Sequence, residues 1–208
     1  MTTDSVPATA QGIIASIRAE RLVPVLRAGS DGELLRQLDC CIEAGLRVVE
    51  LTTTSPGWIE QLRRIRRDPA WSEITVGVGT IVRIEDAVEA LDAGAAFLVS
   101  PYPVPSIRAE MDPSVLLIEG GLTPAELADA SRRNSIAKIF PASSVGPAHL
   151  RALRDVLPGV DFMPTGGVTA SDARDWLAAG AIAVGMGSSL FRMATADIRR
   201  LREELSSI

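Results

Sequence analysis

Cysteine and histidine are nearly absent from this chain of 208 residues, which has two cysteines and one histidine. Cys40 and Cys41 are adjacent within a helical pattern and cannot bridge each other without strain, so no disulfide framework is expected. His149 lies in a predicted surface helix, and no histidine and cysteine residues have the spacing of a zinc site. We therefore expect no bound metal. The unpaired cysteines and the absence of a signal peptide favour a reducing cytoplasm.

The chain also lacks an excess of positive charge and lacks long apolar runs. Its formal net charge of -5 gives no electrostatic reason to expect nucleic acid as a partner. No run approaches the ~18 apolar residues of a transmembrane helix, so no membrane span is expected. Aromatic residues make up 4% of the chain and hydrophobic residues 47%, which indicates a globular protein with an aliphatic core. One cluster of arginines is interpreted as a solvated helix face: Arg63, Arg64, Arg66 and Arg67.

A regular alternation of short apolar runs and amphipathic segments follows a helical pattern at 11–20. Eight such pairs with short connections predict an α/β fold, a single (β/α)8 TIM barrel domain over residues 1–208 with an N-terminal helix. An open doubly wound sheet is the alternative, because counting units does not prove closure. The predicted strands are 22–27, 46–51, 74–78, 95–100, 114–118, the segment around 138, 161–164 and 181–186. The predicted helices are 31–44, 56–67, 83–92, a short one before 113, 123–132, 147–156, 169–179 and about 189–205.

Lysine occurs once in the sequence, and every other cation among the 21 Lys+Arg residues is an arginine. Lys138 stands in the middle of the sixth predicted strand. A lysine buried without a partner commonly gives up its proton and becomes a nucleophile, which an arginine cannot do. Schiff-base formation with a carbonyl substrate is the functional interpretation. The structural alternative is a lysine that reaches solvent or pairs with a buried carboxylate.

The carboxyl ends of the strands carry the active site in barrels of this kind, and here those ends are polar. In the second predicted strand, period-two alternation puts Val48 and Glu50 on one face and Val49 and Leu51 on the other. If Lys138 faces the same interior, Glu50 can serve it as a general acid and base. The alternative is a buried ion pair that only satisfies both charges. The polar groups at the other strand ends are Thr80, Ser100, Glu119, Thr165 and Ser188.

Glycine-rich segments follow the seventh and eighth predicted strands, where phosphate binds in this architecture. Thr165-Gly166-Gly167 and Gly185-Met186-Gly187-Ser188 each precede a helix, so backbone N–H groups and the helix dipole can bind an anion. Arg27, at the end of the first strand and hence beside the eighth, is a candidate cation for the same phosphate. The alternatives are glycines that serve only the turns and an arginine that is merely exposed.

These residues resemble the class I 2-keto-3-deoxy-6-phosphogluconate and 4-hydroxy-2-oxoglutarate aldolases, which are (β/α)8 barrels. The resemblance runs nearly from end to end. Two segments, 55–58 and 138–147, are closer to the 2-keto-3-deoxy-6-phosphogalactonate branch. The motifs that carry the resemblance are Val48-Val49-Glu50-Leu51-Thr52, Val76-Gly77-Val78-Gly79-Thr80, Val99-Ser100-Pro101, Ala137-Lys138-Ile139-Phe140-Pro141-Ala142, Pro164-Thr165-Gly166-Gly167-Val168 and Gly187-Ser188.

The resemblance implies that Lys138 forms a Schiff base with the C2 carbonyl of the keto acid while Glu50 shuttles protons. Retro-aldol cleavage would release pyruvate and glyceraldehyde 3-phosphate without a metal or other cofactor. The family's frequent trimeric state implies a homotrimer. The substrate-binding residues that the resemblance implies are Thr80 and Thr165 at the pyruvyl part and Gly166, Gly167, Gly187 and Ser188 at the distal phosphate.

Three departures from the family pattern leave the substrate open. Thr54, itself a candidate substrate-binding residue, stands where phosphogluconate aldolases commonly have an arginine for the substrate carboxylate, so carboxylate binding would rest on Thr80, backbone N–H groups or a group that the sequence does not reveal. Glu119-Gly120 replaces the usual Pro-Gly, which is expected to place an extra carboxylate near the site. Ser143 replaces a frequent glutamate. The alternatives are an aldolase for an unphosphorylated keto acid such as 4-hydroxy-2-oxoglutarate and a non-catalytic barrel that binds a phosphate ligand.

Overall fold

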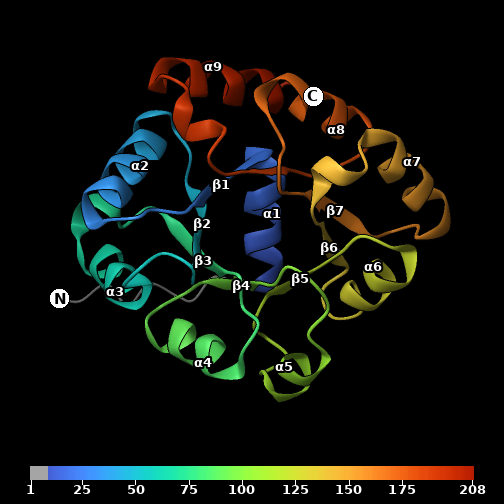
Figure 1. Cartoon of the computed structure of the whole chain (residues 1–208), viewed down its shortest axis with the longest axis horizontal. Helices are drawn as coiled ribbons and strands as arrows, with labels where there is room; N and C mark the ends of the chain where they lie inside the picture. Colours follow the sequence, from blue (N-terminus) through green and yellow to red (C-terminus); the bar gives the residue numbers. More distant parts are fainter. Residues whose placement is uncertain (1–8) are drawn as a thin grey trace.

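The computed structural model describes residues 9–208, in which eight parallel strands form one sheet in the order β7-β6-β5-β4-β3-β2-β1-β8. A parallel bridge between Thr165, just past β7, and Gly185 of β8 joins the two ends of this order. The strands therefore curve into a nearly closed barrel, with α2 to α9 arranged around it (Figure 1). The predicted (β/α)8 barrel is confirmed, and the open-sheet alternative is wrong.

The strands are short aliphatic runs that are buried on both faces, as a parallel sheet covered by helices requires. Each predicted strand overlaps an observed one, and the seventh has the predicted bounds. The strands are β1 Leu22–Leu26, β2 Val48–Thr52, β3 Thr75–Gly79, β4 Phe97–Val99, β5 Leu117–Gly121, β6 Ile136–Ile139, β7 Asp161–Pro164 and β8 Val184–Met186.

Some of the helices begin directly after a residue whose side chain caps them. The Ser30 side chain accepts a hydrogen bond from the Glu33 amide at the start of α2, and Thr123 and Glu126 form a capping box at the start of α6. Within residues 9–208, no helix is both long enough and apolar enough to cross a membrane. The helices are α1 Ala10–Glu20, α2 Asp31–Glu43, α3 Trp58–Arg67, α4 Ile84–Asp92, α5 Pro105–Glu110, α6 Pro124–Ala130, α7 Pro147–Val156, α8 Ala170–Ala178 and α9 Thr195–Ser206.

Several elements begin one to three residues away from the predicted start, and two of these differences have a clear local reason. Helix α3 begins at Trp58 and not at residue 56, because Gly57 has a left-handed backbone with φ of 66° that a helix cannot include. Strand β5 begins three residues later than predicted. Ser114 belongs to a turn in which its amide and hydroxyl both donate to Asp112 Oδ1. Glu119 therefore lies inside the strand and not at its end.

The single long helix predicted at 189–205 is divided into two. A 3-10 turn over Leu190–Arg192 is followed by Met193 with φ of -86° and ψ of 155°, an extended backbone, and α9 starts only afterwards. This interruption lets the turn and the helix pack separately, so that both Leu190 and Ile198 are buried.

Apolar side chains fill the amino-terminal half of the barrel, and α1 closes that end. Ile13, Ile14 and Ile17 of α1 pack with inward-facing residues of the strands, among them Val23 and Met163. Figure 1 shows α1 crossing the middle of the ring of strands. A second apolar layer lies between the strands and the surrounding helices. Polar side chains inside the barrel therefore gather toward its carboxyl end.

Replacing Ile17 with alanine should destabilise the fold, because Ile17 has no exposed surface and its truncation leaves a cavity between α1 and the strands. We expect the free energy of unfolding to fall by about 2–5 kcal/mol, measured by urea denaturation. Ser16→Ala, an exposed neighbour on the same helix, is the control and should change it by less than ~0.5 kcal/mol. An unchanged urea midpoint in Ile17→Ala would contradict the role assigned to α1.

Candidate active site

Lys138 lies inside the barrel and reaches a carboxylate. In β6, Ile136 and Lys138 face the interior, whereas Ala137 and Ile139 belong to the outer apolar layer. The Lys138 side chain is 5% exposed, and its Nζ lies 3.5 Å from Oε1 of Glu50. The same Nζ lies 5.2 Å from the centre of the Phe140 ring, which is a cation–π distance. The expected approach of the lysine to Glu50 is thus observed.

The Glu50 side chain has room inside the barrel only because position 79 of the adjacent strand β3 is a glycine. Glu50 pairs in register with Gly77, and a Cβ placed on Gly79 would lie 1.9 Å from Glu50 Oε1. No larger residue fits at position 79 while the carboxylate stays there. The Oε2 atom is buried and accepts no hydrogen bond from any group in residues 9–208. Buried carboxylate oxygens normally accept a hydrogen bond. Because Glu50 Oε2 accepts none from the described residues, it is free to accept one from a ligand.

Two threonines lie at the strand ends close to this pair. Thr80 directly follows Gly79 and has a φ of 64°, a left-handed backbone that is uncommon outside glycine. Thr165 is buried beside Gly185. A Cβ placed on Gly185 would lie 2.3 Å from Thr165 Oγ1. Both predicted residues therefore stand at the carboxyl ends of the strands, and Thr165 also bridges β7 to β8.

The loop after β7 is built from two glycines in left-handed conformations. Gly166 and Gly167 have φ of 89° and 82°, and Cβ atoms on them would lie 2.8 Å from the Phe140 ring and 2.5 Å from the Ser143 side chain. The Ser143 amide donates to the Gly166 carbonyl at 3.0 Å, which ties this loop to the one after Lys138. The glycines are therefore required by close packing and leave the loop backbone accessible beside the site.

The candidate residues for a phosphate form an exposed rim outside the buried pair. Ser188 and Arg27 are exposed, and Gly187 is half-buried between β8 and the 3-10 turn. Arg27 follows β1, which pairs with β8, so the structure brings the end of that strand to the loop as predicted. Nearest to a Cβ placed on Gly187 is the Val25 carbonyl at 3.6 Å, so packing alone does not require a glycine here.

Thr54 lies on the loop after β2 and belongs to a group of hydroxyls. It is exposed, and its Oγ1 lies 3.1 Å from Oγ1 of Thr52. Thr52 in turn donates to the Leu26 carbonyl at 3.3 Å and lies 3.4 Å from the Ser55 hydroxyl. A neutral hydrogen-bonding surface therefore stands where the family commonly has an arginine.

The expectation that Glu119 adds a carboxylate to the site is wrong. Because β5 continues to Gly121, alternation turns Gly120 toward the interior and Glu119 outward. Glu119 is fully buried against α5, where Arg108 Nε and Nη2 donate to it at 2.6 and 2.9 Å. These hydrogen bonds, and those from Arg108 to Asp129, raise the pKa of Arg108 above its ordinary value. The carboxylate is neutralised and cannot repel a substrate at Lys138.

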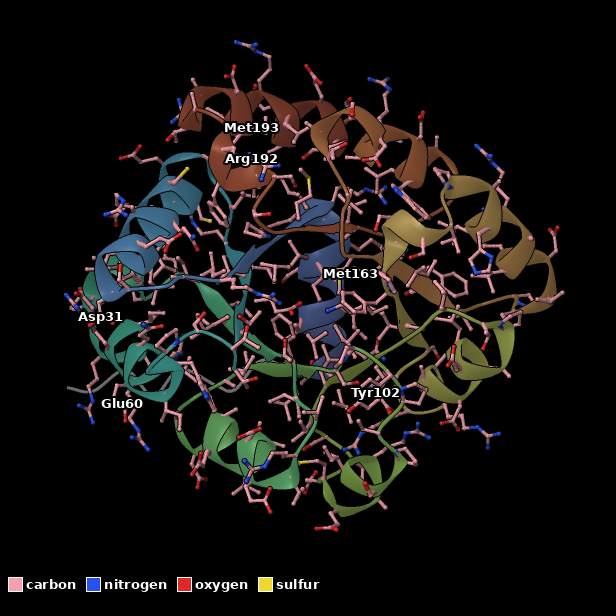
Figure 2. The ribbon with its side chains drawn as sticks, viewed as in Figure 1. Asp31, Glu60, Tyr102, Met163, Arg192 and Met193 are labelled. Atoms are coloured by element: carbon pink, nitrogen blue, oxygen red, sulfur yellow. The ribbon has the colours of Figure 1, made fainter. Side chains whose placement is uncertain are left out.

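Sequence reasoning missed the inward-facing glycines that give the site its space. Gly79 accommodates Glu50, Gly185 accommodates Thr165, and Gly120, in register with Lys138, accommodates the backbone of Pro101. The signal was present in Val76-Gly77-Val78-Gly79, where glycine recurs at every second residue and hence on one face of the strand. Met163, which pairs in register with Lys138, is labelled near the middle of the barrel in Figure 2.

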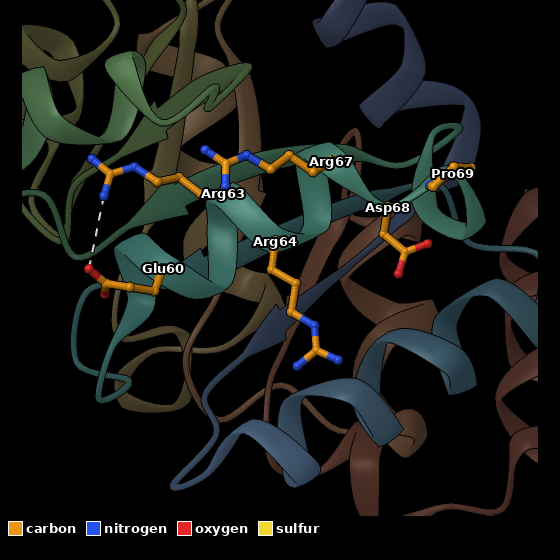
Figure 3. Close-up of a pocket in the computed structure, with 6 residues that line it drawn as sticks. All are labelled: Glu60, Arg63, Arg64, Arg67, Asp68 and Pro69. Carbon is orange, nitrogen blue, oxygen red and sulfur yellow. Dashed lines mark ion pairs between the residues drawn. The ribbon is translucent and has the colours of Figure 1, made fainter.

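A separate hollow lies on the surface of α3. Figure 3 shows its charged lining, in which Arg63 pairs with Glu60 at 3.9 Å. The hollow measures about 790 Å³ and shares no residue with the strand ends around Lys138. The observed exposure of its arginines fits the interpretation as a solvated helix face. Its lining residues are Glu60, Arg63, Arg64, Arg67, Asp68 and Pro69.

Comparisons with known proteins identify the family. The family model described as KDPG and KHG aldolase matches residues 13–203. A probable 2-dehydro-3-deoxy-6-phosphogalactonate aldolase of Rhizobium meliloti is 31% identical over 185 residues, which are 86% of each chain. A crystal structure of a 4-hydroxy-2-oxoglutarate and 2-dehydro-3-deoxyphosphogluconate aldolase is 32% identical, with a TM-score of 0.77, over 93% of this chain and 96% of that one.

A third relative bears on the chemistry of the family. The aldolase from Legionella pneumophila is 25% identical with a TM-score of 0.77, over 93% of this chain and 95% of that one. Its crystal structure holds pyruvate captured at low pH as a covalent carbinolamine intermediate. From the match of the family model along nearly the whole chain, and from relatives above 30% identity, we conclude that this chain belongs to the KDPG and KHG aldolase family.

Proposed function

We propose that this protein is a class I aldolase that cleaves a 2-keto-3-deoxy-6-phospho sugar acid to pyruvate and glyceraldehyde 3-phosphate. The observation that carries the proposal is the buried approach of Lys138 Nζ to Glu50 Oε1 at 3.5 Å, at the carboxyl end of the barrel. A buried ion pair contributes little to stability, so stability alone is a weak reason for a lysine and a carboxylate to meet there. The covalent carbinolamine of the Legionella pneumophila relative supports the same chemistry.

The first half of the proposed reaction forms the imine. Glu50 takes a proton from the Lys138 ammonium, and the neutral amine attacks C2 of the keto acid to form a carbinolamine. Glu50 then returns the proton to the departing hydroxyl, so that water leaves and a protonated imine remains. Among residues 9–208, Glu50 is the only carboxylate within ion-pair distance of Lys138, at 3.5 Å. Glu50 therefore serves both proton transfers.

The second half breaks the carbon–carbon bond. Glu50, now ionised, removes the proton from the C4 hydroxyl, the C3–C4 electrons move into the imine, and the aldehyde departs. Protonation of the resulting enamine at C3 and hydrolysis of the imine release pyruvate and restore the amine. The unpaired Oε2 of Glu50 is suited to accept the C4 hydroxyl proton, because it is buried and makes no other hydrogen bond within the described chain.

The pyruvyl end of the substrate is proposed to bind near Lys138 and Glu50, and the phosphate end at the exposed rim. Thr80, Thr165 and the hydroxyl group at Thr54 are proposed to hold the pyruvyl carboxylate and keto group. The rim is proposed to hold the distal phosphate through backbone N–H groups and one cation. Its residues are Gly166, Gly167, Gly187, Ser188 and Arg27.

The oligomer and its location are proposed from the family resemblance. We propose a homotrimer that acts in carbohydrate metabolism in the cytoplasm, with residues 1–208 as a single barrel domain. Light scattering of the purified protein measures the subunit number. An unphosphorylated keto acid such as 4-hydroxy-2-oxoglutarate is the second candidate substrate, because the family that the chain matches is described as KDPG and KHG aldolase.

Incubation with pyruvate and borohydride should attach one reduced pyruvyl group to the protein, because borohydride reduces the imine to a stable secondary amine. Mass spectrometry of the peptides should locate it on Lys138. Omission of borohydride is the control for non-covalent binding. An unmodified protein would favour the binding barrel over the aldolase.

The Lys138→Arg variant should lose turnover completely while keeping its fold, because the charge and approximate length remain but the guanidinium cannot form the imine. Circular dichroism and the urea midpoint check the fold, and a coupled assay for pyruvate measures turnover. Substantial residual activity would refute the imine mechanism.

The Glu50→Gln variant should keep the shape of the site but lower kcat by about 10²- to 10⁴-fold, the contribution typical of general acid–base catalysis. The exchange of the C3 protons of pyruvate in D2O, followed by NMR, should slow in parallel because it passes through the same enamine. Glu60→Gln, an exposed carboxylate on α3, is the control and should change neither rate. Normal exchange in Glu50→Gln would remove Glu50 from the proposed mechanism.

Arg27→Gln should raise the KM of a phosphorylated substrate about tenfold, the loss expected for one charge-assisted hydrogen bond. The KM of an unphosphorylated analogue should stay the same. Arg36→Gln, an exposed arginine on α2, is the control for a general change in charge. Equal effects on both substrates would contradict phosphate binding at this rim.

A further inference from the structure

The backbone after β4 forms part of the wall of the site beside Lys138. Gly120 pairs in register with Lys138 and turns toward the interior. A Cβ on Gly120 would lie 2.4 Å from the Pro101 carbonyl oxygen and 2.9 Å from that of Ser100. The loop 100–104 therefore occupies the space that a side chain at position 120 would fill, next to the lysine.

The same loop is anchored from the opposite face of β5. Glu119 Oε1 accepts from the Val104 amide at 2.6 Å, and Glu119 also binds the guanidinium of Arg108, which belongs to the helix that follows the loop. Arg108 continues to Asp129 of α6 through Nη1 and Nη2 at 3.2 and 2.8 Å. The far end of the loop is thus tied to two neighbouring elements by charge-assisted hydrogen bonds.

A third contact fixes the near end of the loop. The Ser100 hydroxyl, buried at the end of β4, donates to the Tyr102 carbonyl at 2.7 Å. Prolines at 101, 103 and 105 restrict the backbone between the anchors. Because Gly120 and Glu119 are consecutive residues on opposite faces of one strand, the anchor and the wall of the site share the same short piece of backbone.

On the basis of the proposed function, we propose that Glu119 and Arg108 are positioning residues that hold the 100–104 loop over Lys138 and so determine which sugar acid the site cleaves. Neither touches the substrate. A misplacement of about 1 Å can cost about 100-fold in rate, so a loosened loop changes turnover without any loss of the nucleophile. The C4 configuration of the substrate is the property that depends most on such placement, since the aldehyde leaves from C4.

The test compares two substrates that differ only in the configuration at C4, 2-keto-3-deoxy-6-phosphogluconate and 2-keto-3-deoxy-6-phosphogalactonate. Glu119→Gln removes the charge and places an amide N–H where Arg108 needs an acceptor. We expect kcat/KM for the preferred epimer to fall about 10- to 100-fold and the preference between epimers to shrink by a similar factor. Trapping of pyruvate on Lys138 with borohydride should continue. Arg108→Lys, which keeps the charge, should restore part of the preference relative to Arg108→Gln.

The ratio of the two kcat/KM values separates positioning from mere stability, because partial unfolding lowers both values in proportion. Arg132→Gln is the matched control, since Arg132 is 74% exposed and pairs with the same Asp129 without reaching the loop. If Glu119→Gln fails to fold, Ser100→Ala removes the near anchor without leaving a buried charge and should shift the ratio in the same direction. An unchanged ratio in every folded loop variant would overturn the inference. Absence of pyruvate trapping in the unaltered protein would overturn the proposed function instead.

Discussion

The pairing of Lys138 with Glu50 inside a barrel of aliphatic side chains is the interaction around which the site is organised. A lysine or a glutamate that is buried alone in its charged form carries a large desolvation cost, and pairing the two charges offsets part of that cost. The surrounding sequence accommodates the pair. Gly79 leaves the space for the carboxylate, and the Phe140 ring lies over the ammonium. Under the proposed mechanism, this arrangement keeps the nucleophile and its proton acceptor in contact before any substrate arrives, which is a form of preorganisation.

Two buried carboxylates on different strands face opposite sides of the sheet, and under the proposed mechanism one is reactive and the other structural. Glu50 and Glu119 are both buried carboxylates paired with a cation. Glu50 faces the interior, where Oε1 lies 3.5 Å from Lys138 Nζ and Oε2 has no hydrogen-bond partner among residues 9–208. Glu119 faces the helices and accepts three short hydrogen bonds. A fully satisfied carboxylate holds structure in place, and a partly satisfied one can exchange protons with a ligand. Under the proposed mechanism, a glutamate that faces the barrel interior transfers protons, and a glutamate that faces the helices holds the structure in place.

Much of the fold could be predicted because its signals are local. Apolar runs mark the strands, and the capping residues Ser30 and Thr123 mark helix starts. The approach of Glu50 to Lys138 was expected from alternation in the Glu50 strand, on the condition that Lys138 faces the same interior, and the structure meets that condition. The direction of Glu119 did not, because the true start of β5 is set by the turn at Asp112 and Ser114. The space beside Glu50 also depends on a glycine of another strand, a contact that no single segment reveals. The break at Met193 likewise depends on how two segments pack against the finished barrel.

The use of arginine for every other side-chain cation gives the single lysine a further meaning. A guanidinium stays protonated and forms no imine with a keto acid, so Lys138 is the one side chain in the sequence that can become such a nucleophile. Arg108 provides charge for structure, and Arg27 at the exposed rim is proposed to provide it for phosphate binding. They do so without offering a second amine to the substrate. Under the proposed mechanism, the division between one buried amine and many guanidinium groups separates covalent chemistry from electrostatics by residue type, while α1 and its apolar layer close the opposite end of the barrel.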